Sequence, residues 1–402
     1  MSAEPQPAGN TDLTRRRFLG AAGVAGAAVA APVLSLAAGA CAPQAQLAPA
    51  PSGAAPASAP AGQPAWQKQW DDLVAAAKRE GKLVILTRPG SGYRKALEAF
   101  EQAFPGITVE HTGMVAVQFV PRLLQERQGS VYAVDAFVST YASPAKTLQD
   151  AGGFDPLRPV LFRPDVLDDQ AWAGGFDDGW VDTAKQRAYG TIAVRNRWLW
   201  VNTNLVQDGE IKSLTDLLNP KWKSRIVSAD PRPAGFGYIA GTAMRRVYGD
   251  DIIRRLWKDQ DVFVSRDYRQ MMDGLIKDKY AIAVQAVNDT LLQEYLQQGV
   301  GKNLRPLQLE ELEHYQIASE TAYLINRAPH PNAAKLFLNW VLTKEGQTIW
   351  SKNAENNSRR RDVPPNFPEL APPPGKKFVT LDREETLPEI ERTQQLATEA
   401  LG

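Results

Sequence analysis

The stretch WDDLVAAAKREGKLVILT, residues 70–87, shows the pattern that the rest of the chain follows. Its first part, residues 70–80, spaces apolar residues at helical intervals and stops at Gly81, a natural helix C-cap. Residues 83–87 (LVILT) then form a short β-rich run of the kind found in buried strands. A helix followed at once by a buried strand predicts an α/β fold.

The same alternation continues along the chain, and its spacing is typical of parallel α/β sheets. Residues 197–203 (RWLWVNT) and 320–326 (ETAYLIN) are predicted to be strands that cross between two domains, and residues 330–350 to be the longest helix. The other strands are expected at 107–111, 134–139, 224–231, 262–264 and 281–286, and the other helices at 94–106, 117–129, 143–153, 213–222, 237–249, 250–259, 267–279, 288–298 and 385–400.

Charge and cysteine content exclude several classes of function. The chain has 46 basic and 45 acidic residues, so it lacks the basic field that nucleic-acid binding usually needs. Its 402 residues, 44% of them hydrophobic, suit two domains with real cores. One cysteine and three histidines exclude a disulfide framework, a multi-cysteine zinc or iron–sulfur site and a histidine-rich metal site.

The first 40 residues resemble an export signal. Residues 14–20 (TRRRFLG) follow the twin-arginine order S/T-R-R-x-F-L, with Arg15 and Arg16 as the pair. An uncharged run rich in Ala and Gly continues to Ala40; it is long enough to cross a bilayer but too weakly apolar for a permanent anchor. We expect residues 1–40 to be a signal peptide read by the twin-arginine translocase; the alternative is a disordered tail with a chance arginine triplet.

Cys41, the only cysteine, ends the stretch LAAGAC and resembles the lipidated first residue of a lipoprotein. Ala38 stands where leucine is usual, and residues 38–40 also suit ordinary signal peptidase, which would leave a bare thiol. Residues 42–65 are uncharged and mostly Ala and Pro, which predicts an extended spacer. The folded protein is expected to begin near Trp66.

Four segments carry a resemblance to a known family. They are WDDLVAAAKREGKLVILT at 70–87, WLWVNTNLV at 198–206, SLTDLLNPKWKSRIVSADP at 213–231 and PHPNAAKLFLNWVLTKEGQTIW at 329–350. With them the chain resembles the substrate-binding proteins of ABC importers, in the group of ferric-iron, polyamine and thiamine binding proteins. The resemblance covers most of residues 66–362.

The resemblance implies the two-lobed, type II periplasmic-binding-protein fold, an α/β fold with the ligand in the cleft between the lobes. Lobe 1 is expected at 66–196 plus 321–402, lobe 2 at 204–313, and hinge strands near 197–203 and 314–326. The implied protein is a monomer without enzymatic activity or cofactor. It closes on a small-molecule or ion ligand and delivers it to a permease in the cytoplasmic membrane. Export and a lipid tether fit work in the periplasm or on the outer face of that membrane.

Ligand contacts are expected in loops beyond the carboxyl ends of strands, beside helix N-termini that suit anionic groups. Three such loops lie at 88–93, 139–141 and 232–238, although their glycines and serines would also serve as plain turns and caps. Asn288 and Asp289 begin a predicted helix and either contact the ligand or only cap that helix. The candidate ligand-binding residues are Arg88, Ser91, Thr140, Tyr141, Arg232, Phe236, Tyr238 and Asn288.

A basic triplet, residues 359–361, lies near the cleft side of lobe 1 in the family pattern, and an exposed charge run is the favoured interpretation. Ferric iron is a separate possibility, because phenolate and carboxylate oxygens suit Fe(III). The iron binders of the family use two adjacent tyrosines, and no Tyr-Tyr pair occurs here. We therefore favour an organic or oxyanionic ligand and expect no metal site; if iron binds, Tyr238 and Tyr268 are the candidate ligands.

A rival hypothesis is a twin-arginine-exported oxidoreductase. Residues 235–240 (GFGYIA) fit G-x-G-x-x-G/A, with acidic residues about 20 positions further on. The motif lies mid-chain, however, and a proline-rich turn separates it from the preceding strand. No G-x-S-x-G or H-E-x-x-H motif occurs, so the sequence predicts binding and not catalysis.

Overall fold

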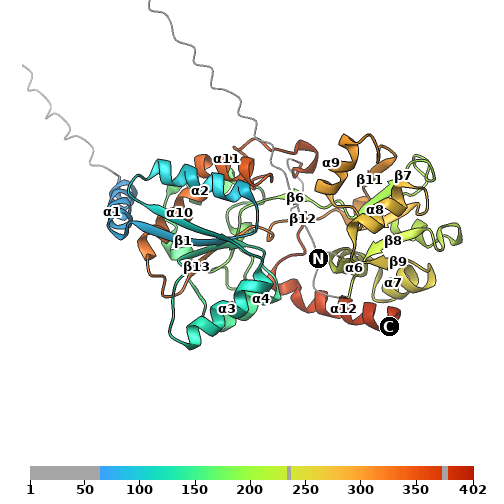
Figure 1. Cartoon of the computed structure of the whole chain (residues 1–402), viewed down its shortest axis with the longest axis horizontal. Coiled ribbons are helices and arrows are strands. Elements are labelled where there is room, and N and C mark those ends of the chain that lie inside the picture. Colours follow the sequence, from blue (N-terminus) through green and yellow to red (C-terminus); the bar gives the residue numbers. More distant parts are fainter. Residues whose placement is uncertain (1–63, 233–236, 374–378) are drawn as a thin grey trace, which may run out of the picture. The chain divides into compact units, whose positions relative to one another are not determined.

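The computed structural model describes residues 64–232, 237–373 and 379–402, and within this part of the chain it contains two mixed sheets covered by helices (Figure 1). The helices are α1 (Ala65–Glu80), α2 (Ser91–Ala103), α3 (Ala116–Gln128), α4 (Ser143–Asp150), α5 (Pro164–Leu167), α6 (Gly237–Tyr248), α7 (Asp251–Ile253), α8 (Tyr268–Ile276), α9 (Asp289–Gln297), α10 (Pro331–Val341), α11 (Lys344–Asn353) and α12 (Leu387–Leu401). The strands are β1 (Lys82–Thr87), β2 (Thr108–Gly113), β3 (Ala136–Ser139), β4 (Phe154–Asp155), β5 (Tyr189–Gly190), β6 (Val194–Arg195), β7 (Leu199–Asn202), β8 (Ile226–Ala229), β9 (Phe263–Ser265), β10 (Ile282–Val284), β11 (Leu304–Leu307), β12 (Tyr315–Gln316) and β13 (Thr321–Ile325).

The first sheet has the order β2-β1-β3-β13-β4, and β5 pairs with β13. Strands β1, β2 and β3 are parallel, whereas β13 is antiparallel to β3 with Thr321 opposite Ser139. The start of β13 therefore lies at the same edge as the carboxyl ends of β1 and β3. This sheet and the helices packed on it form the first lobe.

Side chains of the first sheet alternate between two cores, as the two-residue period of a strand requires. Ala136 and Val138 pack with helices α1, α2, α10 and α11, whereas Phe137 between them packs with α3 and α4. Tyr323 in β13 lies on the same side as Phe137, and their rings stack 5.1 Å apart. Helices consequently cover both faces, and the central strands β3 and β13 are buried on both sides.

The second sheet has the order β11-β7-β10-β8-β9 and forms the second lobe with its helices. Strands β8, β9 and β10 are parallel, whereas β7 and β11 run antiparallel to their partners. Trp200 and Ala283 face α8 and α9, while the neighbouring Leu199, Val201 and Ile282 pack on the opposite face, towards α6 and α7.

The chain passes between the sheets on a two-stranded ribbon. Strands β6 and β12 pair antiparallel, with Tyr315 opposite Arg195. The predicted hinge segment 314–326 contains β12, whereas residues 199–202 are a strand of the second sheet and residues 321–325 a strand of the first. The residues on one side of the β6–β12 ribbon belong to the first sheet and those on its other side to the second sheet. The ribbon is therefore the element that crosses between the lobes.

The prediction of one long helix over residues 330–350 is wrong. The chain forms α10 and α11, which are separated at Leu342 and Thr343. The Thr343 hydroxyl donates to the Trp340 carbonyl oxygen, 2.7 Å away, and accepts from the Gly346 backbone N–H at 3.0 Å. Thr343 thus caps the second helix, as threonine commonly does.

Helix α12 packs on the second lobe, although residues 321–402 are predicted to belong to the first. It contacts α6 and α7, and Ala397 is buried in the second-lobe core (Figure 1). The Thr393 hydroxyl accepts a hydrogen bond from the Thr242 hydroxyl of α6 at 3.0 Å. The apolar face of α12 has this lobe as its partner, which the linear order of the chain does not show.

No described helix is long and apolar enough to cross a membrane.

Candidate ligand-binding site

A polar cavity of about 730 Å³ lies within the described part of the chain and is called here the main cavity. Its wall comes from the loop and first turn that follow β1, from the end of α11 and the residues after it, and from one residue of the second lobe, Asn288. The lining residues are Arg88, Pro89, Gly90, Ser91, Gly92, Tyr93, Lys95, Asn288, Lys352, Asn353, Ala354, Glu355 and Asn356.

The first turn of α2 forms one wall of the main cavity. Gly90 precedes the helix, and no side chain in the described part of the chain caps its first N–H groups. Gly92 lies against the other wall: a Cβ atom there would come within 1.8 Å of the Asn353 carbonyl oxygen. Only glycine permits this approach, so α2 presents its uncapped N-terminus to the cavity directly beside the segment 353–356.

A buried carboxyl group, Glu320, lies behind the cavity wall and is fully shielded from solvent. Its Oε1 accepts from the Tyr93 hydroxyl at 2.6 Å and from the Asn356 amide at 2.5 Å. Its Oε2 accepts from the Trp350 indole N–H at 2.8 Å. Burial raises the pKa of Glu320, and the hydrogen bonds and the nearby Arg88 charge act in the opposite direction. Glu320 therefore ties α2, α11 and the following segment to the start of β13.

A smaller cavity, of about 220 Å³, lies beside the β6–β12 ribbon and is called here the hinge cavity. Asn288 lines it as well, so the two cavities meet at that residue. Arg195 forms an ion pair with Glu313, and the Tyr315 hydroxyl donates to the same carboxylate at 2.9 Å. The lining residues are Val194, Arg195, Asn196, Arg197, Trp198, Tyr268, Gln285, Val287, Asn288, Gln316 and Leu370.

Gln285 has an unusual backbone conformation in the hinge cavity. Its φ of 49° lies in the left-handed region, which is uncommon for a residue other than glycine. Its side-chain Oε1 accepts from the Ala240 N–H at 2.8 Å, in the first turn of α6. The N-terminus of α6 therefore has an internal acceptor, in contrast to that of α2.

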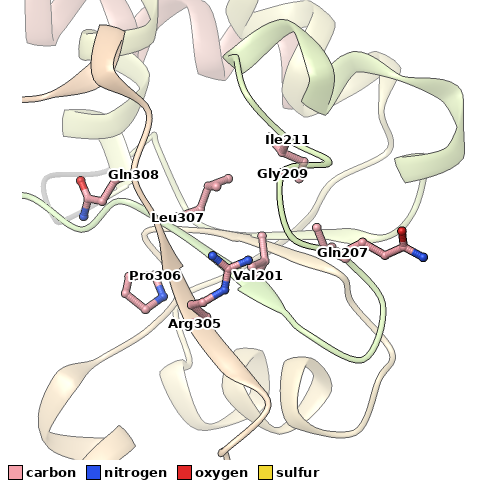
Figure 2. A pocket seen from close by; sticks show the side chains of 9 residues that line it. Val201, Gln207, Gly209, Ile211, Arg305, Pro306, Leu307 and Gln308 are labelled. Atoms are coloured by element: carbon pink, nitrogen blue, oxygen red, sulfur yellow. The ribbon is translucent and has the colours of Figure 1, made fainter.

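A third cavity, of about 350 Å³, belongs to the second lobe alone (Figure 2). Arg305 and Leu307 of edge strand β11 extend towards the loop that carries Gln207 and Gly209, and Pro306 between them points to the other side of the strand. The Arg305 guanidinium is paired with Asp208 at 2.7 Å. This cavity shares no residue with the loops that follow the carboxyl ends of the parallel strands, so we do not assign the ligand to it.

The structure brings together part of the predicted site. Arg88, Ser91 and Asn288 line the main cavity, and Tyr268 lines the hinge cavity. Thr140 lies outside both and donates to the Ser319 carbonyl oxygen at 3.3 Å. Phe236, Cys41, Arg15 and Arg16 lie outside the described residues.

Two predicted contacts have partners within a lobe instead. Tyr141 is only 4% exposed and stacks on Tyr323 in the first-lobe core, with ring centroids 6.5 Å apart. Arg232 binds Asp230 through Nε at 2.9 Å and the Gly402 carbonyl oxygen through Nη1 at 2.8 Å. Neither lines the main or the hinge cavity.

The tyrosines considered for iron are held in surroundings that favour the neutral phenol. Burial raises the pKa of Tyr268, and burial together with the Asp382 charge raises the pKa of Tyr238. Only Tyr268 lines one of the two cavities. Among the described residues no cluster of three or more His, Cys, Asp or Glu side chains could hold a metal ion.

The arginine triplet is not an exposed charge run, because Arg359 and Arg360 are buried. The Arg359 guanidinium lies over Trp172 at 4.7 Å and donates to the carbonyl oxygens of Ala173 and Gly175. Arg360 is paired with Asp362 at 2.9 Å. Backbone carbonyl oxygens distant in sequence accept hydrogen bonds from these two guanidinium groups. Because the local sequence does not show these acceptors, a run of three arginines is interpreted as exposed.

Several lining residues lay outside the predicted contact segments, notably Asn353 and Asn356 of the main cavity and Gln285 of the hinge cavity. Tyr93 is the last residue of the predicted contact loop 88–93, although it is not named among the candidate ligand-binding residues. Residues 353–356 lie at and after the end of a helix. The expectation that ligand contacts lie in loops after strands therefore does not include them.

The family comparison agrees with this architecture. Residues 91–353 match the model of the family described as bacterial extracellular solute-binding protein. The chain belongs to this family. Its match includes residues 235–240, the stretch on which the rival oxidoreductase hypothesis depends. No curated protein sequence matches the chain.

Solved structures share the fold at low sequence identity. Iron-bound HitA from Pseudomonas aeruginosa is 18% identical with a TM-score of 0.55, and the match covers 80% of this chain and 99% of that one. The ferric binding protein from Campylobacter jejuni is 18% identical with a TM-score of 0.59, over 79% and 99% of the two chains. A substrate-binding protein of an ABC transporter from Agrobacterium tumefaciens is 13% identical with a TM-score of 0.54, over 80% and 94%. These likenesses establish the two-lobed α/β fold of the present solute-binding protein.

Proposed function

We propose that this protein is the solute-binding component of an ABC importer and that its ligand is an oxyanion or organic acid held in the main cavity. The observation that carries the proposal is the uncapped N-terminus of α2, which meets that cavity beside Arg88. Free helix N–H groups and a guanidinium together suit a carboxylate, phosphate or sulfonate.

The charges of the cavity wall support an anionic ligand. Arg88, Lys95 and Lys352 line the main cavity, and Glu355 is the one acid among its lining residues. Arg195 and Arg197 add two cations in the hinge cavity, where the Arg195 charge is already balanced by Glu313. A wall of this sign attracts anions and repels a bare metal cation.

A bare ferric ion therefore fits less well than an anion. The described tyrosines near the cavities are hydrogen-bonded to a carboxyl group, as Tyr93 is, or have raised pKa values, as Tyr268 has. A second candidate is an anionic ferric chelate. A Trichodesmium protein of the same fold is described in complex with iron and citrate ligands, and a negatively charged chelate would suit the basic wall.

Capture would proceed by closure of the two lobes about the β6–β12 ribbon. Asn288 begins α9 in the second lobe, whereas the other residues of the main cavity belong to segments of the first lobe. A ligand that touches Arg88 and Asn288 together would stabilise the closed state, since a ligand shifts such an equilibrium by its preference for one state.

The amino-terminal segment completes the proposal. Twin-arginine export through Arg15 and Arg16 and lipidation at Cys41 would place the folded part outside the cytoplasmic membrane, with residues 42–65 as a tether. Delivery to a permease would follow from there. Globomycin sensitivity and mass spectrometry of the amino terminus test the lipidation step, which a free Cys41 thiol would contradict.

The ligand itself is tested by native mass spectrometry and metal analysis of protein purified without refolding, followed by calorimetry with phosphate, citrate and ferric citrate. We expect a bound anion and an Arg88→Ala variant whose affinity falls about ten- to a hundred-fold, the usual effect of losing a charge-assisted hydrogen bond. Arg255→Ala is the matched control, because Arg255 is exposed on the second lobe and lines neither cavity.

Two results would contradict the proposal. Stoichiometric iron without an accompanying anion would identify a metal binder. A retained nucleotide with NAD(P) absorbance would instead favour the exported oxidoreductase.

A further inference from the structure

One side of the main cavity presents hydrogen-bond donors to a ligand. The Asn288 side-chain oxygen accepts from the Leu291 N–H at 2.9 Å, which leaves its amide nitrogen for the cavity. Arg88 and the backbone of the first turn of α2 offer N–H groups, and the Ser91 hydroxyl beside them can also donate. This donor side suits the negatively charged group of a ligand.

The end of α11 and the residues directly after it have the opposite character. Asn353 donates its amide nitrogen to the Ile349 carbonyl oxygen at 2.8 Å. Asn356 donates its own to Glu320 at 2.5 Å and to the Ala354 carbonyl oxygen at 3.2 Å. No described residue donates to the side-chain oxygen of either, which leaves these two oxygens as acceptors for a ligand in the cavity that both residues line.

Glu320 determines the orientation of the Asn356 amide. As a carboxylate it can only accept, and the donors of Tyr93, Trp350 and Asn356 all converge on it. Turning the Asn356 amide around would set its oxygen against the carboxylate and lose the hydrogen bond. The buried charge therefore decides which atom of Asn356 faces the ligand.

We propose that the main cavity selects an anion that carries a hydrogen-bond donor, a hydroxyl or an ammonium group, beside its negative charge, and that Glu320 is the positioning residue behind this preference. The inference rests on the proposed function, since it assigns the anion to the donor side. A plain acid of the same size would fill the donor side and leave the asparagine oxygens without partners once the lobes close. Unpaired polar groups of this kind are a strong source of discrimination.

The test uses three acids with the same four-carbon skeleton: succinate has no donor, malate has a hydroxyl and aspartate has an ammonium group. Calorimetry on the full-length protein freed of bound ligand gives three dissociation constants. We expect malate or aspartate to bind at least about ten-fold more tightly than succinate. Whichever of the two binds more tightly identifies the donor as a hydroxyl or an ammonium group.

Variants separate positioning from mere stability. Glu320→Gln cannot accept all three hydrogen bonds, so the malate-to-succinate and aspartate-to-succinate ratios should fall towards one while succinate still binds. Glu80→Gln is the matched control: Glu80 also accepts from an asparagine amide, that of Asn332 at 2.6 Å, but lines neither cavity. Its ratios should equal those of the wild type. Asn356→Ala removes the acceptor itself and should lower the ratios even if Glu320→Gln does not fold.

The outcomes distinguish this inference from the proposed function. If all three acids bind the wild type equally, and Arg88→Ala weakens all three, the cleft binds anions but the donor preference is wrong. If the ratios survive in both Glu320→Gln and Asn356→Ala, the role given to Glu320 is wrong. If none of the three binds, the donor preference is rejected for this cavity, and the phosphate and citrate titrations decide separately whether it takes anions.

Discussion

Gly92 shows how one residue fixes the geometry of the main cavity. The first turn of α2 lies so close to the end of α11 that any side chain at position 92 meets the Asn353 carbonyl oxygen. The sequence marks this loop through its glycines, yet it does not reveal which of them is required for a close approach. The partner at Asn353 is more than 250 positions away, and only the tertiary structure identifies it.

We predict that Gly92→Ala lowers both stability and ligand affinity. A methyl group placed 1.8 Å from a carbonyl oxygen must push the two cavity walls apart, and overpacking of this kind typically costs about 1–3 kcal/mol. Thermal unfolding and calorimetry measure the two effects. Gly299→Ala shows whether a glycine change alone has this effect: a Cβ there meets nothing within 4 Å, but its φ of 82° is also strained. Unchanged affinity in Gly92→Ala would show that the wall segments tolerate the displacement.

Histidine burial predicts a loss of stability in mild acid. Burial lowers the pKa of His314, with a smaller opposing effect from its hydrogen bond to the Leu312 carbonyl oxygen, and burial and the Arg94 charge lower that of His111. The ordinary histidine pKa is 6.5, so below that pH the unfolded chain takes up protons before the folded one does. Stability that is present at neutral pH is therefore lost as the pH falls through 6.5 towards the folded-state pKa values.

The unfolding midpoint at pH 7.5, 6.5 and 5.5 measures this effect. His314→Asn should flatten the decline between pH 6.5 and 5.5, and His111→Asn combined with it should flatten it further. An equally steep decline in the double variant would assign the acid sensitivity to other groups.

At the scale of elements, most strands and helices follow from hydrophobic periodicity. The break between α10 and α11 does not, because residues 330–350 keep a helical pattern throughout. What interrupts the helix is a local competitor: both the hydroxyl and the backbone N–H of Thr343 donate to the Trp340 carbonyl oxygen, and the same hydroxyl caps the next helix. Threonine in a helical pattern is too common for this outcome to be predicted from the sequence alone.

Helix α12 joins the second lobe through contacts that the chain order hides. Arg246 of α6 binds the Glu389 carboxylate at 2.7 Å. The segment that precedes α12 contacts the first lobe, where Asp382 accepts from the backbone N–H groups of Ile317 and Ala318. The chain therefore connects the two lobes a further time, in addition to the β6–β12 ribbon.

Removal of residues 387–402 should destabilise the second lobe selectively. The deletion uncovers the face of α6 that carries Thr242 and exposes the pocket filled by Ala397. Hydrogen–deuterium exchange should rise in α6 and α7 while the amides of β1 and β3 in the first lobe remain protected. A uniform rise across both lobes would mean that α12 stabilises the molecule as a single cooperative unit.

At the scale of the whole molecule, the sequence predicted the fold class well and the site in part. Local periodicity and the family segments are enough to predict two α/β lobes, because the residues of each strand and helix carry the hydrophobic pattern of that element. The site depends on which loops converge, and this is why Arg88 and Asn288 lie in the main cavity whereas Tyr141 and Arg232 do not. Buried charges such as Glu320 and Arg359 are the least predictable, since their partners are scattered along the chain.

The convergence of Arg88 and Asn288 on one cavity leads to the last prediction, that the lobes close on the ligand. A ligand bound to both residues gains its full set of contacts only when the walls from the two lobes meet, so binding should favour a more compact molecule. Small-angle X-ray scattering on the full-length protein, without ligand and with saturating ligand, should show a smaller radius of gyration in the second case. Arg88→Ala at the same ligand concentration should keep the larger value. An unchanged radius at proven saturation would mean that the cavity is already formed, and that the β6–β12 ribbon is a fixed connection between the lobes.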